Sequence, residues 1–164
     1  MILVTEMGEY LVGAYLKLVF DCDFVVYNQR VEKQREIDVV GLDTKKNIAY
    51  LCEVVTHLEG LNYGKSNEHT IQKIFDKFKA FHEYGVENLP DMRTVCMLWS
   101  PYVPVGYLTD NLSKMEKQFD FEVEFVINER YTSKVNELRK RAKEETRESG
   151  EPFYRALQIL EHLR

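Results

Sequence analysis

The stretch from Tyr27 to Thr56, YNQRVEKQREIDVVGLDTKKNIAYLCEVVT, decides the fold that this sequence predicts. Its apolar runs are separated by short polar segments, which is typical of consecutive strands joined by turns. Two of these runs contain a carboxylate, Asp38 in the first and Glu53 in the second. Because a charge inside an apolar strand is costly without a partner, a proton or a metal, these carboxylates indicate a functional site.

Strand periodicity predicts that the two carboxylates are neighbours. Side chains alternate along a strand, so Glu53 shares a face with Val55, and Asp38 shares a face with Val40. The short polar connection 43–47 predicts that the two strands form an antiparallel hairpin. Two carboxylates that meet across this hairpin repel each other, and a hard cation such as Mg²⁺ would relieve the repulsion.

Five segments in the first half of the chain carry a resemblance to a known family. In their order they resemble the small bacterial predicted endonucleases of the YraN-like family, which belong to the restriction-endonuclease-like superfamily with its PD-(D/E)XK active site. The family pattern reads roughly E-x-x-A-x-x-Y-L, N-x-R, G-E-I-D-L-I, F-V-E-V-K-T-R and Y-G. The resemblance spans residues 7–81, and the matching segments are GEYLVGAYL (8–16), YNQR (27–30), REIDVVGLD (35–43), AYLCEVVTH (49–57) and NYG (62–64).

This resemblance implies a metal-dependent nuclease that acts on DNA or RNA. It implies that Asp38 and Glu53 bind Mg²⁺ (or Mn²⁺) and that Glu9 is a supporting acid. Glu9 also has a simpler interpretation, because an acid in the first turn of a helix compensates the helix dipole.

The sequence departs from the family at the catalytic lysine, whose position is occupied by Val55. In the superfamily this lysine orients or activates the attacking water and offsets charge on the phosphate. We expect another residue to replace it, and the candidates are His57 on the same strand face, Lys65 in the following loop and Lys73 on the following helix.

Several further residues are candidates for nucleic-acid binding. The loop after Glu53 contains glycines and a tyrosine, which suits a segment that faces a substrate, although a plain surface loop has the same composition. Lysines on the following helix are equally consistent with a solvated face. The nucleic-acid-binding candidates are Arg30, Tyr63, Lys65 and Lys77.

The composition indicates one globular domain. The chain has 164 residues, of which 45% are hydrophobic and 30% charged, and this length is enough to bury a substantial core. The net charge of −5 argues against strong non-specific binding to phosphate backbones, although residues 130–143 form a local basic segment.

Three cysteines without paired spacing predict reduced, buried thiols in a cytoplasmic protein rather than a zinc site or a disulfide framework. The sequence shows neither an apolar run of about 18 residues nor a signal peptide, so we expect no association with a membrane.

The chain predicts an α/β fold with a restriction-endonuclease-like core, in which helices flank a mixed sheet of about five strands. Residues 1–130 form this core, and residues 131–164 form a C-terminal helical hairpin that packs on the core or at the interface of a homodimer. In the first strand, Phe24, Val25 and Val26 are core candidates. The expected helices are 5–20, 67–84, 107–119, 132–147 and 153–163, and the expected strands are 24–31, 36–42, 47–55, 92–99 and 121–127.

Three functions remain open at this stage. The first is a metal-dependent phosphodiesterase that acts on nucleic acid. The second is a nucleic-acid-binding module on the same fold, whose active site has decayed at Val55. The third is a structural or regulatory protein-interaction domain, whose carboxylates are satisfied by internal hydrogen bonds or by Arg30 and Arg35.

Overall fold

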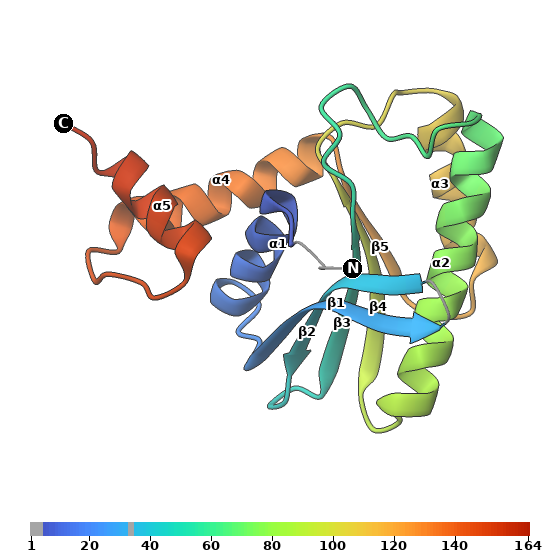
Figure 1. Ribbon diagram of the computed structural model, residues 1–164, viewed down its shortest axis with the longest axis horizontal. Helices are drawn as coiled ribbons and strands as arrows, with labels where there is room; N and C mark the ends of the chain where they lie inside the picture. The colour runs from blue at the N-terminus through green and yellow to red at the C-terminus, as the bar shows by residue number, and fades with distance from the viewer. Residues whose placement is uncertain (1–4, 33–34) are drawn as a thin grey trace.

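The protein is an α/β structure in which helices cover both faces of one mixed sheet, as the sequence predicts (Figure 1). The computed structural model describes residues 5–32 and 35–164. The strands lie in the order β1-β2-β3-β4-β5. The elements are α1 (Met7–Leu18), β1 (Phe24–Glu32), β2 (Arg35–Asp43), β3 (Ile48–Val54), α2 (Asn67–Asn88), β4 (Arg93–Ser100), α3 (Tyr107–Gln118), β5 (Val123–Ile127), α4 (Glu129–Glu144) and α5 (Pro152–Glu161).

The sheet changes direction at β3. β1, β2 and β3 pair as antiparallel neighbours, whereas β3, β4 and β5 are parallel. The β2–β3 turn is closed by Asp43, whose Oδ1 accepts hydrogen bonds from the backbone N–H groups of Lys45 and Lys46. Parallel neighbours need crossover connections, which α2 and α3 supply. The carboxyl ends of β3, β4 and β5 therefore meet at one edge of the sheet, where α/β proteins commonly bind ligands.

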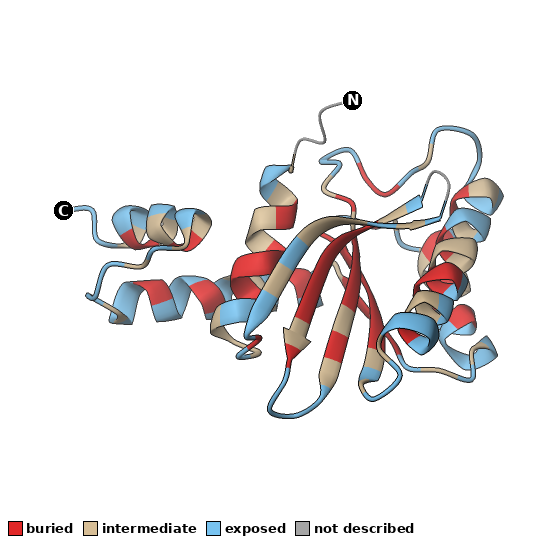
Figure 2. Ribbon diagram, turned by 60° about the horizontal axis from the view of Figure 1, so that its bottom comes forward, coloured by how far each residue is buried: buried red, intermediate tan, exposed pale blue. Residues whose placement is uncertain are grey.

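Two apolar cores lie on opposite faces of the sheet. One is formed with α2 and α3 and the other with α1 and α4, and Figure 2 shows buried residues along the central strands and on the inward faces of these helices. The predicted core residues of α2 are confirmed, since Ile74, Phe78 and Phe81 are fully buried. In β1, however, Phe24 and Val26 are exposed, because β1 is an edge strand.

The close approach of α1 to β2 depends on Gly41. A Cβ atom at this position would lie 2.8 Å from Leu16 Cδ1 and 3.1 Å from Cys22 Sγ. Leu16 is fully buried, so it has little freedom to move away. The absence of a side chain at Gly41 therefore fixes how close α1, with Glu9 in its first turn, lies to the sheet.

The C-terminal helices form a pair that extends from one side of the core (Figure 1). α4 contacts β5 and α1, while α5 packs on α4 and α1. The hydroxyl of Tyr15 on α1 donates a 2.7 Å hydrogen bond to Glu137 of α4. The apolar residues of α5 are only partly buried, since Tyr154 is fully buried whereas Ile159 and Leu160 are 50% and 61% exposed, and Leu163 beyond the helix is 70% exposed.

None of the helices in the described part of the chain is long and apolar enough to cross a membrane.

We predict that Gly41→Ala lowers the free energy of unfolding by about 1–3 kcal/mol, because the added methyl group overpacks the contact between α1 and β2. Chemical denaturation measures this change. Gly150→Ala is the matched control, since no atom lies within 4 Å of its new Cβ. Equal stability of the two variants would show that α1 does not need this close approach.

Candidate active site

The register of β2 and β3 brings Asp38 and Glu53 together. Val39 pairs with Cys52 and Val40 pairs with Leu51, so the next pair along this antiparallel ladder is Asp38 with Glu53. Both carboxylates are deeply placed, with 9% of Asp38 and 3% of Glu53 exposed.

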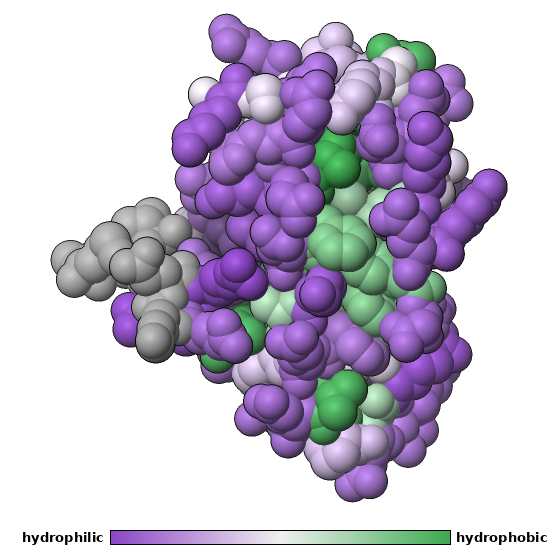
Figure 3. All heavy atoms as spheres, turned by 90° about the vertical axis from the view of Figure 1, so that its right-hand side faces the viewer, coloured by the Kyte–Doolittle hydropathy of each residue, from purple (hydrophilic) through white to green (hydrophobic). Residues whose placement is uncertain are grey.

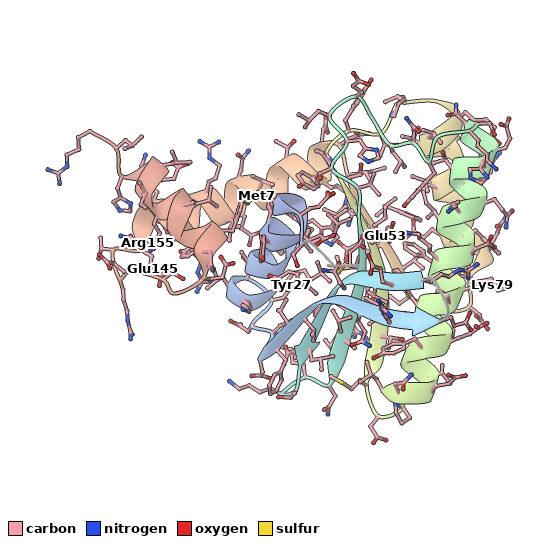
Figure 4. All side chains as sticks on the ribbon, viewed as in Figure 1. Met7, Tyr27, Glu53, Lys79, Glu145 and Arg155 are labelled. Atoms are coloured by element: carbon pink, nitrogen blue, oxygen red, sulfur yellow. The ribbon has the colours of Figure 1, made fainter. Side chains whose placement is uncertain are left out.

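The two carboxylates open into one recess beside the start of α1. The predicted convergence of Asp38 and Glu53 beside the first helix is therefore confirmed. Figure 4 shows Glu53 in the interior of the molecule, on the side of the sheet's carboxyl edge. The recess is lined by Glu6, Glu9, Asn28, Glu36, Asp38, Glu53, Val54, Val55, Thr56, His57 and Tyr63.

The two oxygens of Glu53 have different surroundings. Oε1 accepts a 2.5 Å hydrogen bond from the Tyr63 hydroxyl and lies 2.5 Å from Nζ of Lys77. Oε2 is buried and has no hydrogen-bond partner among the described residues. An unpaired carboxylate oxygen in a buried position is costly, so Oε2 is the atom of this site that most needs a further ligand.

The environment of Asp38 makes its ionised form costly. Its Oδ2 accepts a 2.8 Å hydrogen bond from the backbone N–H of Val54. Burial, followed by the negative charge of Glu53, raises the pKa of Asp38 to about 8. A cation bound between the two carboxylates would stabilise the ionised form of Asp38 and so offset both effects.

Lys77 supplies the positive charge that the strand lacks at Val55. Its side chain is only 23% exposed and extends from α2 to Glu53. Val55 is 5% exposed and belongs to the core that includes Phe78 of the same helix. A packing residue thus occupies the strand position, while the cation comes from the neighbouring helix.

Among the described residues, none of those that we expected to replace the lysine pairs with Glu53. Lys73 is exposed, and its Nζ lies 5.9 Å from the centre of the Tyr63 ring instead of at a carboxylate. His57 is exposed at the mouth of the recess. Lys65 and Arg30 are exposed and are not among the residues that line the recess.

Tyr63 connects the loop after β3 to α2. Its ring lies against Lys77 as well as Lys73, with Nζ of Lys77 5.4 Å from the ring centre. Its backbone N–H donates to the Thr70 hydroxyl at 3.1 Å. Tyr63, a predicted nucleic-acid contact, therefore also holds Glu53 in place.

Glu9 is near the two carboxylates but serves the helix as well. It is 8% exposed, and its Oε2 accepts a 3.0 Å hydrogen bond from the Glu6 backbone N–H. Burial is the main cause that raises the pKa of Glu9. Glu9 therefore accepts a hydrogen bond at the start of α1 and also lines the recess, while dipole compensation stays a prediction.

The carboxylate pair fits a divalent cation that completes its coordination with substrate and water. No three His, Cys, Asp or Glu side chains within residues 5–32 and 35–164 form a ready metal cluster. Mg²⁺ commonly uses only one or two protein carboxylates together with phosphate oxygens and water. The free Oε2 of Glu53 beside Asp38 matches that requirement.

The role of Lys77 was not predictable from its spacing alone. It lies four residues after Lys73, so both lysines occupy the same side of α2. Both lysines lie near the Tyr63 ring, and what separates them is that only Lys77 pairs with Glu53 among the described residues, which depends on how α2 packs against the sheet.

We predict that Asp38→Asn stabilises the protein without added metal at pH 8 by about 1–3 kcal/mol. A raised pKa means that the contribution of Asp38 to stability is fully present below its unfolded value of 3.8 and is lost as the pH rises toward about 8. Asparagine keeps the hydrogen bond from Val54 and removes the charge. Chemical denaturation at pH 5 and pH 8 measures the effect, which should be larger at pH 8.

Asp23→Asn is the control that should change stability in the opposite direction. Hydrogen bonds from Thr44 lower the pKa of Asp23, so this group stabilises the protein above its unfolded pKa of 3.8. Asp23→Asn should therefore lower stability at pH 8. If Asp38→Asn also lowers stability there, Asp38 is not a strained carboxylate.

Comparisons of the chain with protein-family models, with curated proteins and with solved structures find no match in any of the three.

Proposed function

We propose that this protein is a metal-dependent phosphodiesterase that cleaves DNA or RNA. The observation that carries the proposal is the environment of Glu53. One of its oxygens is held by Lys77 and Tyr63, while the other is buried without a partner among the described residues, and Glu53 lines the same recess as Asp38. The order of the motifs around these residues, which resembles the YraN-like nucleases, supports the same function.

Asp38 and Glu53 are the residues that would hold Mg²⁺ or Mn²⁺. When bound, such an ion stabilises charge on a phosphoryl oxygen and makes a coordinated water more acidic. Two features support this assignment. The negative charge of Glu53 disfavours the ionised form of Asp38, and Oε2 of Glu53 has no partner among the described residues.

Lys77 is the proposed substitute for the family's strand lysine. Its ammonium group pairs with Oε1 of Glu53 and so places a positive charge behind a carboxylate of the recess, although Lys77 itself is not among the lining residues. From there it would offset the negative charge that grows on a phosphate during cleavage. Tyr63 is a positioning residue, since its hydroxyl holds the same oxygen of Glu53. His57 stands at the mouth, where an imidazole can exchange a proton with the substrate. Glu9 supports the recess from α1.

A nucleic-acid-binding module without cleavage is the second candidate. The acids Glu6, Glu9 and Glu36 line the recess in addition to the central pair and repel a phosphate, which counts against cleavage in the recess. This candidate would therefore bind nucleic acid through a surface outside the recess.

The third candidate is a protein-interaction domain whose carboxylates are satisfied by internal hydrogen bonds or by Arg30 and Arg35. Internal groups do bind one oxygen of Asp38 and one of Glu53, but Oε2 of Glu53 has no partner among the described residues. Arg30 and Arg35 are not among the lining residues, and Arg35 contacts the Asp76 backbone carbonyl instead.

We predict that the protein binds Mn²⁺ and that Asp38→Asn and Glu53→Gln each weaken this binding at least tenfold. Each change removes one anionic ligand of the proposed site while keeping the shape of the side chain. Calorimetric titration with Mn²⁺ measures the affinity. Glu59→Gln, at an exposed loop acid outside the recess, is the control that should leave it unchanged. Binding that survives both site substitutions would remove these carboxylates from the proposal.

We predict that Lys77→Met lowers the rate of oligonucleotide cleavage in Mn²⁺ about a hundredfold, a typical effect of losing one group that stabilises transition-state charge. Methionine retains most of the aliphatic stem, so the loss reports on the charge. Lys73→Met is the matched control one turn away and should change the rate only a few-fold. Similar losses in both variants would mean that Lys77 has no special role, and thermal unfolding would verify that both variants fold.

A further inference from the structure

We infer that the substrate enters this site as a single strand, whose unpaired bases rest on an apolar rim beside the recess. The rim consists of Leu58, Tyr102 and Val105. This inference rests on the proposed function and names the substrate class of the same site.

The rim is attached directly to the recess. His57 lines the recess and begins a turn in which its carbonyl accepts a hydrogen bond from Gly60. The Tyr102 ring lies against Gly60, where a Cβ atom would be 3.2 Å from the ring, and the Tyr102 carbonyl accepts a 2.9 Å bond from Leu61. The loops after β3 and β4 therefore contact each other next to His57, a residue of the recess, and Figure 1 shows both loops at the same end of the molecule.

The Tyr102 loop is held firmly. The side chain of Asn128 accepts a 2.8 Å hydrogen bond from the Val103 N–H and donates a 3.0 Å bond to the Val103 carbonyl. Val103 itself is fully buried. The neighbouring Tyr102 ring is thus presented by a rigid segment, as a stacking surface requires.

The rim is exposed to an unusual degree for apolar side chains. Leu58 is 88% exposed, Val105 is 89% exposed and Tyr102 is 49% exposed. Figure 3 shows a mainly hydrophilic face with hydrophobic atoms at its upper end, along its middle and near its lower end, and both loops lie toward the upper end in Figure 1. An aromatic ring with apolar neighbours is a surface on which bases of any sequence can stack.

The burial of the carboxylates favours a flexible strand over a rigid duplex at the reacting position. Asp38 and Glu53 are 9% and 3% exposed, so a phosphate must descend into the recess to share a cation with them. Each phosphate of a duplex is held in a stiff double helix, whereas a single strand can bend one phosphate inward and leave its bases on the rim.

The charge of the recess favours the same substrate. Glu6, Glu9 and Glu36 line it in addition to the central pair. A duplex carries one negative charge per about 1.7 Å of its axis, and a single strand carries about half that density. Repulsion is therefore smaller for a single strand, and stacking on Tyr102 supplies attraction that does not depend on phosphate contacts.

Fluorescence anisotropy with labelled oligonucleotides in Mn²⁺ tests this inference. The probes are a single strand, a blunt duplex and the same duplex with a single-stranded tail. We expect the single strand and the tailed duplex to bind at least tenfold more tightly than the blunt duplex. Tyr102→Ala should weaken single-strand binding about tenfold and leave the affinity for Mn²⁺ unchanged, whereas Tyr102→Phe should restore binding.

Val86→Ala is the matched control, because Val86 is 58% exposed near the opposite end of α2. Tight binding and cleavage of the blunt duplex would overturn the single-strand inference and leave the phosphodiesterase proposal standing. Equal losses in Tyr102→Ala and Val86→Ala would also overturn it. A protein that binds neither Mn²⁺ nor any of the three probes would contradict both the inference and the proposed function.

Discussion

The structure depends on how two neighbouring carboxylates are kept below the protein surface. Removing an ionised group from water costs several kcal/mol even after the protein relaxes, and a second like charge beside it adds to that cost. Lys77 and Tyr63 compensate one oxygen of Glu53. Asp38 keeps one backbone hydrogen bond and a raised pKa. The remaining imbalance is the physical reason to regard the recess as a site rather than as part of the core.

The sheet topology creates this arrangement from local features. The tight turn at Asp43 sets the β2–β3 register, and this register determines that Asp38 faces Glu53 rather than the opposite side. The change to parallel pairing at β3 then requires a helix, and α2 carries Lys77 back across the same face. The loop that starts this crossover places Tyr63 between the helix and the strand. A few residues of turn and loop therefore position the whole charged group.

The strand side of the site was predictable from the sequence, but the helix side was not. Alternation with a period of two depends only on the backbone, so it predicted the Asp38–Glu53 pair correctly. It could not show that Phe24 and Val26 are exposed, because alternation does not tell an edge strand from a central one. From the sequence, Lys73 is a candidate to replace the catalytic lysine and Lys77 a candidate nucleic-acid contact, and helical spacing puts both on the same side of α2. Only the three-dimensional packing of α2 shows that the ammonium group of Lys77 reaches Glu53.

The position of Lys77 on α2 explains why Val55 does not exclude the proposed chemistry. Val55 contributes apolar packing to the core that includes Phe78, and it also lines the recess. Lys77 instead reaches Glu53 from α2, and its side chain remains 23% exposed. A long lysine side chain can bury its aliphatic part while its ammonium group stays near water. Electrostatic stabilisation depends on where a charge lies in space and not on which residue of the chain carries it. Sequence spacing is therefore a weaker criterion for this activity than the distance from an ammonium group to the central glutamate.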